Sequence, residues 1–360
     1  MYILYNRFRK SCLPPQGKGE LMKKPQIALA SMGGTITMTT DGTGGGVKPA
    51  LDASALVADI NGLGDVADLC ATTLFTIPGA SLSFGQLAEA LTWARLAVEE
   101  GANGVVLVQG TDTLEETAYF FDLYWDRPEP LVLTGAMRPP QVPGADGPAN
   151  LLAAVQVAAD PSSRSQGVLV VMNDEVHSAA RVRKIRASGL GAFSSPSFGP
   201  LGQVQEGRVI YGNRTRRPGP LLLPEPSRPM RIALLETHLG DQGDLLQLAV
   251  DAGFDGAVVE AFGVGHVSHK LADVISAALP RVPVVFTTRT GAGTTFSGTY
   301  GFSGSEGDLL ERGVIPAGWL DGRKAAVLLR AVLDAGFDRE SIRTEFEVRG
   351  SYVGNLVHVE

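Results

Sequence analysis

Threonine hydroxyls follow two short apolar runs of the chain, in positions where they could act on a substrate. Thr35 follows two glycines in "SMGGTITMTTDGTGGG", residues 31–46, directly after the apolar run 27–30. Thr111 and Asp112 follow a second apolar run, 104–108, in "QGTDTLEET". Glycine lets a ligand approach the backbone closely, and a hydroxyl beside a carboxylate can activate water or an alcohol. These turns predict threonine-based nucleophilic chemistry.

The second turn also has a purely structural interpretation. The pairs Asp112–Glu115 and Thr113–Glu116 both have the spacing of a capping box at the start of a helix. Capping accounts for one side chain, whereas the turn offers three polar ones beside the same crevice. The turn therefore has two interpretations, helix capping and catalysis.

Lys184 is the third candidate, in the basic run "RVRKIR", residues 181–186. Such a run normally forms a solvated face. If Lys184 instead lay beside Thr111 and Asp112, and burial lowered its pKa towards the working pH, it could accept a proton.

Other kinds of site fit the sequence poorly. "GTGGGVKP" has Val47 where a P-loop needs glycine before the lysine, and "GVGHVS" has Ser268 where a dinucleotide-binding turn has its last glycine. His266 and His269 could share a helix face, but no third metal ligand lies near them in the sequence. No G-x-S-x-G elbow occurs. We expect no cofactor and no metal.

Alternating apolar runs and amphipathic stretches predict an α/β protein with largely parallel sheets. The expected strands are 26–30, 104–108, 130–134, 167–172, 231–236, 256–260 and 282–287, and the expected helices include 84–102, 243–257 and 322–337. In parallel sheets, ligands bind beyond the carboxyl ends of the strands, where polar turns such as "SMGGT", "QGTDT" and "TGAMRP" follow. These turns are therefore expected to share one crevice.

The length of 360 residues suits about two domains. Five prolines between residues 211 and 230 break regular structure and indicate a boundary. We expect a disordered extension over residues 1–22, an N-terminal domain over 23–211, a linker over 212–229 and a smaller domain over 230–360.

Composition limits the partners and the compartment. The net charge of -7 and the pI of about 5.4 disfavour a nucleic-acid partner. The sequence contains no apolar run long enough to span a membrane and no secretory signal pattern, and two cysteines are too few for a disulfide framework. We expect a cytoplasmic protein that does not bind membranes.

Taken together, these segments resemble the bacterial-type L-asparaginase/glutaminase family over nearly the whole chain. The markers are "MGGTI" (32–36), "VQGTDTLEETAYFFDL" (108–123), "LTGAMRP" (133–139), "ADGPANLLAAV" (145–155) and "VVMNDEVHSAARVRK" (170–184). The resemblance implies a larger Rossmann- or flavodoxin-like domain, a smaller α/β domain, and homodimers or homotetramers whose sites are completed by a neighbouring subunit. It also implies hydrolysis of L-asparagine, and more weakly L-glutamine, to the acid and ammonia.

The resemblance further implies roles for individual residues. Thr35 matches the nucleophilic threonine, and Thr111, Asp112 and Lys184 match a second catalytic triad. Asp112 would also bind the α-ammonium group of the substrate.

Three further positions would bind the substrate. Ser81, in "PGASLSF", matches the serine that holds the α-carboxylate, with Ser83 as the alternative alignment. Gly110 would line the site, and the carbonyl of Ala136 would face the departing amide.

Departures from the family pattern leave other interpretations open. The mobile lid of the family normally carries an activating tyrosine, whereas no tyrosine occurs here between Tyr5 and Tyr119. Either a polar lid residue substitutes, with Thr39, Thr43 and Lys48 as the choices, or the second triad alone activates Thr35. The alternative functions are a non-catalytic amino-acid-binding protein and a glutamine amidotransferase component, although the latter normally has an extra N-terminal domain.

Three single replacements also distinguish the chain from the family pattern. Met32 stands in place of threonine and Gln109 in place of histidine; we expect Met32 to contribute only backbone and Gln109 to be tolerated. His266 occupies the position of an asparagine in a "GxGN" turn.

Overall fold

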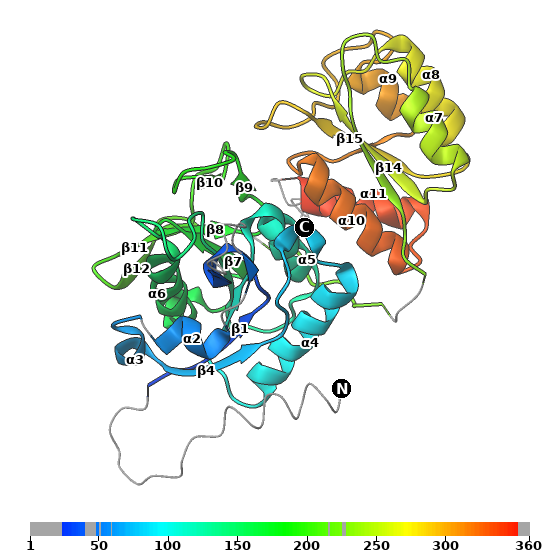
Figure 1. The fold of residues 1–360 in the computed structure, drawn as a ribbon. Coiled ribbons are helices and arrows are strands. Elements are labelled where there is room, and N and C mark those ends of the chain that lie inside the picture. Colours follow the sequence, from blue (N-terminus) through cyan, green and yellow to red (C-terminus); the bar gives the residue numbers. More distant parts are fainter. Residues whose placement is uncertain are drawn as a thin grey trace, which may run out of the picture. The chain divides into compact units, whose positions relative to one another are not determined.

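The computed structural model describes residues 24–39, 48–49, 52–58, 60–214, 217–224 and 228–351. The chain divides into two compact units, residues 1–220 and 221–360, each with its own sheet and helices (Figure 1). The predicted α/β architecture, with a larger N-terminal and a smaller C-terminal domain, is confirmed. The expected extension over residues 1–22 lies outside the described residues.

The N-terminal unit is built on an eight-stranded sheet with the order β12-β11-β8-β7-β6-β5-β1-β4. Five strands are parallel: β4 (Asp68–Thr73), β1 (Gln26–Ser31), β5 (Gly104–Val108), β6 (Leu131–Thr134) and β7 (Val168–Met172). Antiparallel strands extend it: β8 (Glu175–Ser178), β11 (Gly202–Gln205) and β12 (Arg208–Tyr211). The sheet is therefore mixed, and the sequence predicted four of its five parallel strands, all but β4.

The change of direction after β7 has a local cause. β7 and β8 are joined by Asn173 and Asp174, whose φ angles are 53° and 60°. Two successive residues with positive φ form the tight hairpin turn that matches strand twist, and asparagine and aspartate tolerate this conformation. The chain therefore turns back beside β7 and does not cross over.

Helices cover both faces of the parallel strands (Figure 1). α6 (Gly147–Ala159), with α2 (Ala53–Ala58) and α3 (Leu63–Val66), packs on the face that holds Leu29 and Val106. α4 (Phe84–Glu99) and α5 (Leu114–Tyr124) contact the sheet from the other side. Because both faces are buried, the strands are continuous apolar runs and do not alternate with polar residues.

The C-terminal unit has a four-stranded parallel sheet in the order β13-β14-β15-β16. Its strands are β13 (Ile232–Glu236), β14 (Gly256–Ala261), β15 (Val284–Thr288) and β16 (Ile315–Pro316). Its helices are α7 (Asp244–Asp251), α8 (His269–Ala278), α9 (Glu306–Glu311), α10 (Gly322–Asp334) and α11 (Arg339–Gly350).

Two of these helices end earlier than the sequence pattern indicates. α7 and α10 both run into the segment "DAGF", whose glycines, Gly253 and Gly336, each have a φ of 74°. A glycine with positive φ just past the last helical residue is the usual helix stop. The expected helices 243–257 and 322–337 are correct in position and too long at their C-terminal ends.

Two small hairpins stand apart from the main sheets. β2 (Met38–Thr39) pairs with β3 (Lys48–Pro49), and β9 (Arg183–Lys184) pairs with β10 (Phe193–Ser194). Within the described ranges, no helix is both long and apolar enough to cross a membrane.

Candidate active site

Three strands bring their following turns to one edge of the N-terminal sheet. Ser31 at the end of β1 pairs with Val108 at the end of β5, and Val108 pairs with Thr134 at the end of β6. Because the strands are parallel and end in register, the turns that contain Thr35, Thr111 and Ala136 begin side by side. The register therefore places these three turns at the same edge of the sheet.

Glycines let these turns touch through their backbones. Gly34 has a φ of 96°, and a Cβ atom built on it would lie only 2.1 Å from the backbone nitrogen of Gly110. A Cβ on Gly79 would lie 2.9 Å from the Gly110 carbonyl oxygen. Side chains do not fit at such distances, so glycine is required here by space and, at Gly34, by conformation. Thr35 and Thr111 each follow a contacting glycine directly.

The second turn holds the predicted lysine. The Nζ atom of Lys184 donates to the Oγ1 of Thr111 at 2.9 Å and pairs with the Oδ1 of Asp112 at 2.8 Å. Thr111 is 5% exposed, whereas the Asp112 side chain is 68% exposed in the single chain. An amine on a buried hydroxyl can accept a proton as that hydroxyl, or a water bound to it, reacts. The structure therefore brings these three residues together.

The capping box predicted for this turn is wrong. Thr113 is the N-cap of α5 but makes no side-chain capping bond; its Oγ1 donates to the Gly79 carbonyl at 2.9 Å. Glu115 is fully buried, and its Oε2 accepts a hydrogen bond from the backbone N–H of Lys184 at 2.8 Å. Thr113 and Glu115 therefore connect this turn to the segments of Gly79 and Lys184.

Glu115 is a functional candidate that sequence reasoning missed. This turn binds Lys184 at two places. Thr111 and Asp112 contact the side-chain amine, and Glu115 accepts a hydrogen bond from the backbone N–H. The sequence shows an acidic residue in the first turn of a helix, where the helix dipole favours it anyway. Only the long-range contact with Lys184 reveals the second role.

The two candidate serines have different environments. Ser83 is the N-cap of α4: its Oγ accepts from the backbone N–H of Gln86, and its own backbone N–H donates to the Gln86 side chain. Ser81 is exposed and ends a short 3₁₀ helix, Gly79–Ser81, whose first residue contacts Gly110. The Ser83 hydroxyl is thus already used, while Ser81 lies on the segment that touches the site.

The turn that carries Ala136 is fixed by polar side chains. Asp146 accepts hydrogen bonds from the backbone N–H groups of Met137 and Arg138, both at 2.9 Å. Asn150 donates to the carbonyl of Gly135 at 3.0 Å. These contacts on both sides of Ala136 hold its backbone in one orientation.

The same turn lies beside the residue that follows Thr35. A Cβ on Gly147 would lie 2.7 Å from the Cγ1 of Ile36, and 3.5 Å from the Cβ of Ala136. Ile36 is buried. Gly147, at the start of α6, therefore lies beside both Ile36 and Ala136.

Met32 and Gln109, which depart from the family pattern, lie directly after β1 and β5. Met32 is buried and its backbone N–H donates to the Val108 carbonyl at 2.8 Å. Gln109 is buried and its Nε2 donates to the Thr117 hydroxyl at 3.2 Å. Of the candidate lid residues, Thr39 and Lys48 lie in the β2–β3 hairpin, and Thr43 lies outside the described residues.

In the C-terminal unit, His266 belongs to an ordered cluster. Its Nε2 lies 3.1 Å from the Oε2 of the buried Glu306, and the rings of Tyr300 and Phe302 pack edgewise on it at 4.9 and 5.0 Å. Burial raises the pKa of Glu306, but backbone N–H groups, among them that of Tyr300, outweigh it and hold this pKa below its usual value. His266 is therefore bound to a carboxylate within the protein.

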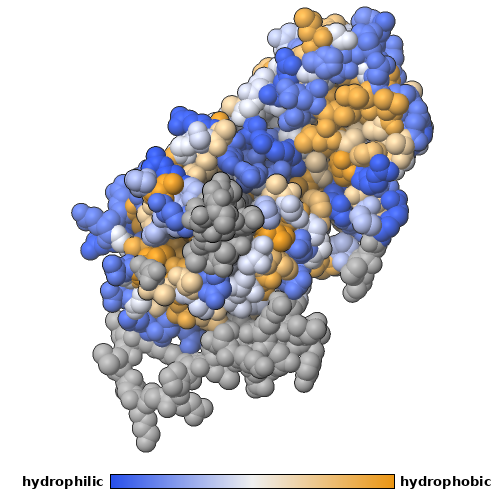
Figure 2. All heavy atoms as spheres, viewed as in Figure 1, coloured by the Kyte–Doolittle hydropathy of each residue, from blue (hydrophilic) through white to orange (hydrophobic). Residues whose placement is uncertain are grey.

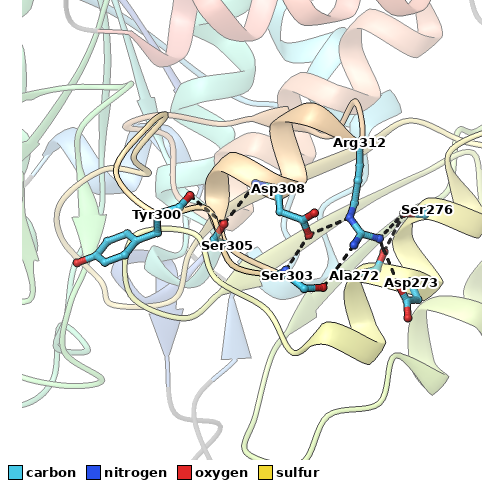
Figure 3. Close-up of polar contacts among 9 residues, drawn as sticks. Ala272, Asp273, Ser276, Tyr300, Ser303, Ser305, Asp308 and Arg312 are labelled. Atoms are coloured by element: carbon cyan, nitrogen blue, oxygen red, sulfur yellow. Dashed lines mark hydrogen bonds and ion pairs between the residues drawn. The ribbon is translucent and has the colours of Figure 1, made fainter.

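A second network fixes the loop that bears these rings. The Ser305 hydroxyl donates to the Tyr300 carbonyl, and the Asp308 carboxylate accepts hydrogen bonds from the Gly304 N–H and from the Arg312 guanidinium (Figure 3). Arg312 also donates to Ser276 on α8. His269 instead begins α8. No group of three or more potential metal ligands occurs in the part of the chain that the structure describes.

Comparison with known proteins identifies the family to which this α/β protein belongs. Residues 26–217 match the family described as "Asparaginase, N-terminal", and residues 231–346 match "Glutaminase/Asparaginase C-terminal domain". The chain belongs to the asparaginase family, as the sequence markers predicted.

Individual relatives are similar over most of their length. An L-asparaginase of Bacillus licheniformis is 33% identical over 325 residues, which cover 89% of this chain and 98% of the relative. A structure titled as a probable cytoplasmic L-asparaginase from Campylobacter jejuni matches with a TM-score of 0.81 and 30% identity, covering 90% of this chain and 99% of that one. A glutamyl-tRNA(Gln) amidotransferase component of Methanosphaera stadtmanae is 29% identical over 318 residues, covering 85% of this chain and 71% of that relative.

Proposed function

We propose that the protein is an L-asparaginase, which hydrolyses L-asparagine to L-aspartate and ammonia through a threonine acyl-enzyme. One observation carries the proposal: the Lys184 amine bonds the Thr111 hydroxyl in a turn whose backbone touches the turn of Thr35. The full-length relatives named L-asparaginase support the same substrate.

The first half-reaction belongs to Thr35. Its Oγ attacks the side-chain amide carbon of asparagine, and the resulting oxyanion is stabilised by backbone N–H groups of the glycine-rich turns. One such donor contributes roughly 3 kcal/mol in comparable acyl-transfer sites. The proton of the Thr35 hydroxyl is transferred to the amide nitrogen, the C–N bond breaks, ammonia leaves, and an ester links Thr35 to the aspartyl group.

The second half-reaction belongs to the Lys184 turn. A water held by Thr111 attacks the ester carbon while Lys184, acting as the neutral amine, accepts one proton of the water. The C–O bond to Thr35 breaks, Lys184 returns the proton to the Thr35 oxygen, and aspartate is released. Asp112 holds the lysine in place through the contact of 2.8 Å between them.

The remaining positions bind the substrate. We assign the α-carboxylate contact to Ser81, because the hydroxyl of Ser83 already caps α4. Asp112, whose side chain remains largely exposed in the single chain, binds the α-ammonium group. Gly110 lines the site, and the Ala136 carbonyl accepts a hydrogen bond from the departing amide.

Activation of Thr35 is proposed to come from the Lys184 turn or from the loop beyond Thr35. That loop has no tyrosine, and its polar candidates are Thr39, Thr43 and Lys48. A glycine-rich loop can close over a bound substrate. Variants of these three residues, compared by their rate of acylation, identify the contributor.

We further propose that the protein is a cytoplasmic homo-oligomer, a dimer or a tetramer. The C-terminal unit carries exposed hydrophobic side chains that a second copy would cover (Figure 2). They are Leu239, Leu245, Leu248, Phe296 and Phe302. The relative of known structure is titled as cytoplasmic. Light scattering of the purified protein gives the oligomeric state.

Ammonia release tests the proposed function. The wild-type protein should hydrolyse L-asparagine faster than L-glutamine and should leave D-asparagine largely intact. Thr35→Ala should abolish release while retaining substrate binding and the fold. Binding of L-asparagine without ammonia release by the wild-type protein would instead identify an amino-acid-binding protein.

A further inference from the structure

Lys184 lies on a hairpin that has few backbone contacts of its own. Lys184 pairs with Phe193 in a ladder of only two residue pairs, and Ile185 donates to the Ala192 carbonyl beyond it. Residues 185–189, at the far end of this hairpin, are exposed. An isolated two-stranded hairpin is marginally stable in water, so the direction of the lysine depends on how the hairpin is anchored.

One anchor lies at the base of this hairpin, away from the proposed chemistry. His177, on β8, precedes the hairpin, and Ser195 follows it directly after β10. The Nδ1 of His177 and the Oγ of Ser195 are 3.0 Å apart, and both side chains are buried. This bond joins the entry and the exit of the segment that carries Lys184.

The protonation state of His177 is compatible with a stable hydrogen bond to Ser195. Burial lowers the pKa of His177 to about 4, so its ring is neutral near pH 7, with one N–H and one acceptor nitrogen. The Nε2 lies 3.3 Å from a carboxylate oxygen of Glu175. With the proton on Nε2, facing that carboxylate, Nδ1 accepts the hydrogen bond from the Ser195 hydroxyl.

We propose that His177 and Ser195 are positioning residues, which orient Lys184 for its reaction by closing the base of its hairpin. Neither contacts Lys184, Thr111 or Asp112 in the hydrogen bonds of the described residues. They act through the backbone, together with Glu115, which holds the Lys184 N–H from the other side. The inference rests on the proposed function, in which the Lys184 amine accepts the proton of the hydrolytic water.

Ser195→Ala tests the proposal, with Ser194→Ala as the matched control on the same hairpin. A displacement of about 1 Å at a reacting group can cost on the order of 10²-fold in rate. We expect Ser195→Ala to lower kcat for L-asparagine about 10- to 100-fold, with KM changed less than about threefold and the acyl-enzyme accumulating. Ser195→Thr keeps the hydroxyl and should restore kcat.

The histidine gives an independent pair of variants. His177→Asn keeps a side-chain acceptor near the position of Nδ1 and should retain more activity than His177→Leu, which removes it. Equal kcat values for Ser195→Ala and Ser194→Ala would overturn the proposal. It would also be overturned if Ser195→Ala raised KM for L-asparagine and left kcat unchanged.

A measurement without turnover separates this proposal from the proposed function. In Ser195→Ala, hydrogen exchange at the backbone N–H groups of Lys184 and Ile185 should be several-fold faster than in Ser194→Ala, because the hairpin opens more often. Unchanged hydrogen exchange would refute the positioning role of His177 and Ser195, even if the variant were inactive. If the wild-type protein released no ammonia but the variant exchanged faster, the proposed asparaginase function would be refuted. The anchoring of the hairpin by His177 and Ser195 would still hold.

Discussion

Replacing Gly34 with alanine should separate the two turns that carry Thr35 and Thr111. The new Cβ would lie 2.1 Å from the Gly110 nitrogen, whereas ordinary contacts begin at 3.4 Å, so the backbones must move apart by more than 1 Å. The three atoms nearest to that Cβ, in Gln109 and Gly110, all belong to backbone, which cannot rotate away as a flexible side chain could. Separation of the turns is therefore the only way to relieve the clash.

The stability cost of this variant has two parts. A residue other than glycine at a φ of 96° costs about 1–2 kcal/mol. Overpacking of a close contact adds about 1–3 kcal/mol. The free energy of unfolding should thus fall by roughly 2–5 kcal/mol. Displacement of about 1 Å between the hydroxyl of Thr35 and the Lys184 turn should lower kcat on the order of 10²-fold.

Gly101→Ala is the matched control for this experiment. Gly101 has a φ of 104°, and no heavy atom lies within 4 Å of the Cβ position, so only the conformational cost of about 1–2 kcal/mol applies. Chemical denaturation and steady-state ammonia release are measured on both variants. If Gly34→Ala keeps the kcat of the wild type, or matches Gly101→Ala in both measurements, the contact between the turns is not what assembles the site.

Three further predictions follow from the same contacts. Thr111→Val should abolish ammonia release while the circular dichroism spectrum stays unchanged; residual turnover near the wild-type rate would exclude this hydroxyl. Glu115→Ala should lower the free energy of unfolding by about 1.5–3 kcal/mol and lower kcat, whereas Glu115→Gln, which keeps an acceptor for the Lys184 N–H, should lose less of both. The pKa of His177 is about 4 in the folded chain and near 6.5 when unfolded, so the unfolded state binds more protons between these values. Stability should therefore fall by roughly 3 kcal/mol as pH decreases from 6.5 to 4, and His177→Asn should lose that part of the pH dependence in denaturation curves.

The sequence predicted the parallel part of the fold well, for a physical reason. Parallel strands that are buried on both faces must be apolar throughout, and polar or glycine-rich turns must follow where ligands bind. The runs 26–30 and 104–108 satisfy both conditions, so their sequence alone places Thr35 and Thr111 at one sheet edge. β4, "DLCATT", lacks such a run because it is an edge strand with one open side, and no apolar pattern indicates it.

The lysine turn could not be predicted in the same way. Composition alone favours a solvated face for "RVRKIR", and the contact of Lys184 with Thr111 links residues 73 positions apart. The β9–β10 hairpin that makes this contact has only two residues in each strand, too few for a periodic pattern. Family resemblance indicated the pairing, while the anchoring roles of Glu115 and His177 depend on long-range contacts that leave no local pattern in the sequence.

Trapping the acyl-enzyme is the most direct test of the central claim, that Thr35 is acylated and the Lys184 turn releases the acyl group. Lys184→Met is mixed with L-asparagine, quenched in acid and digested, and the modified peptide is sequenced by mass spectrometry. The account predicts an aspartyl ester on Thr35, formed with a burst of ammonia and accumulating because hydrolysis is slow. An ester on Thr111, or full turnover without Lys184, would contradict it.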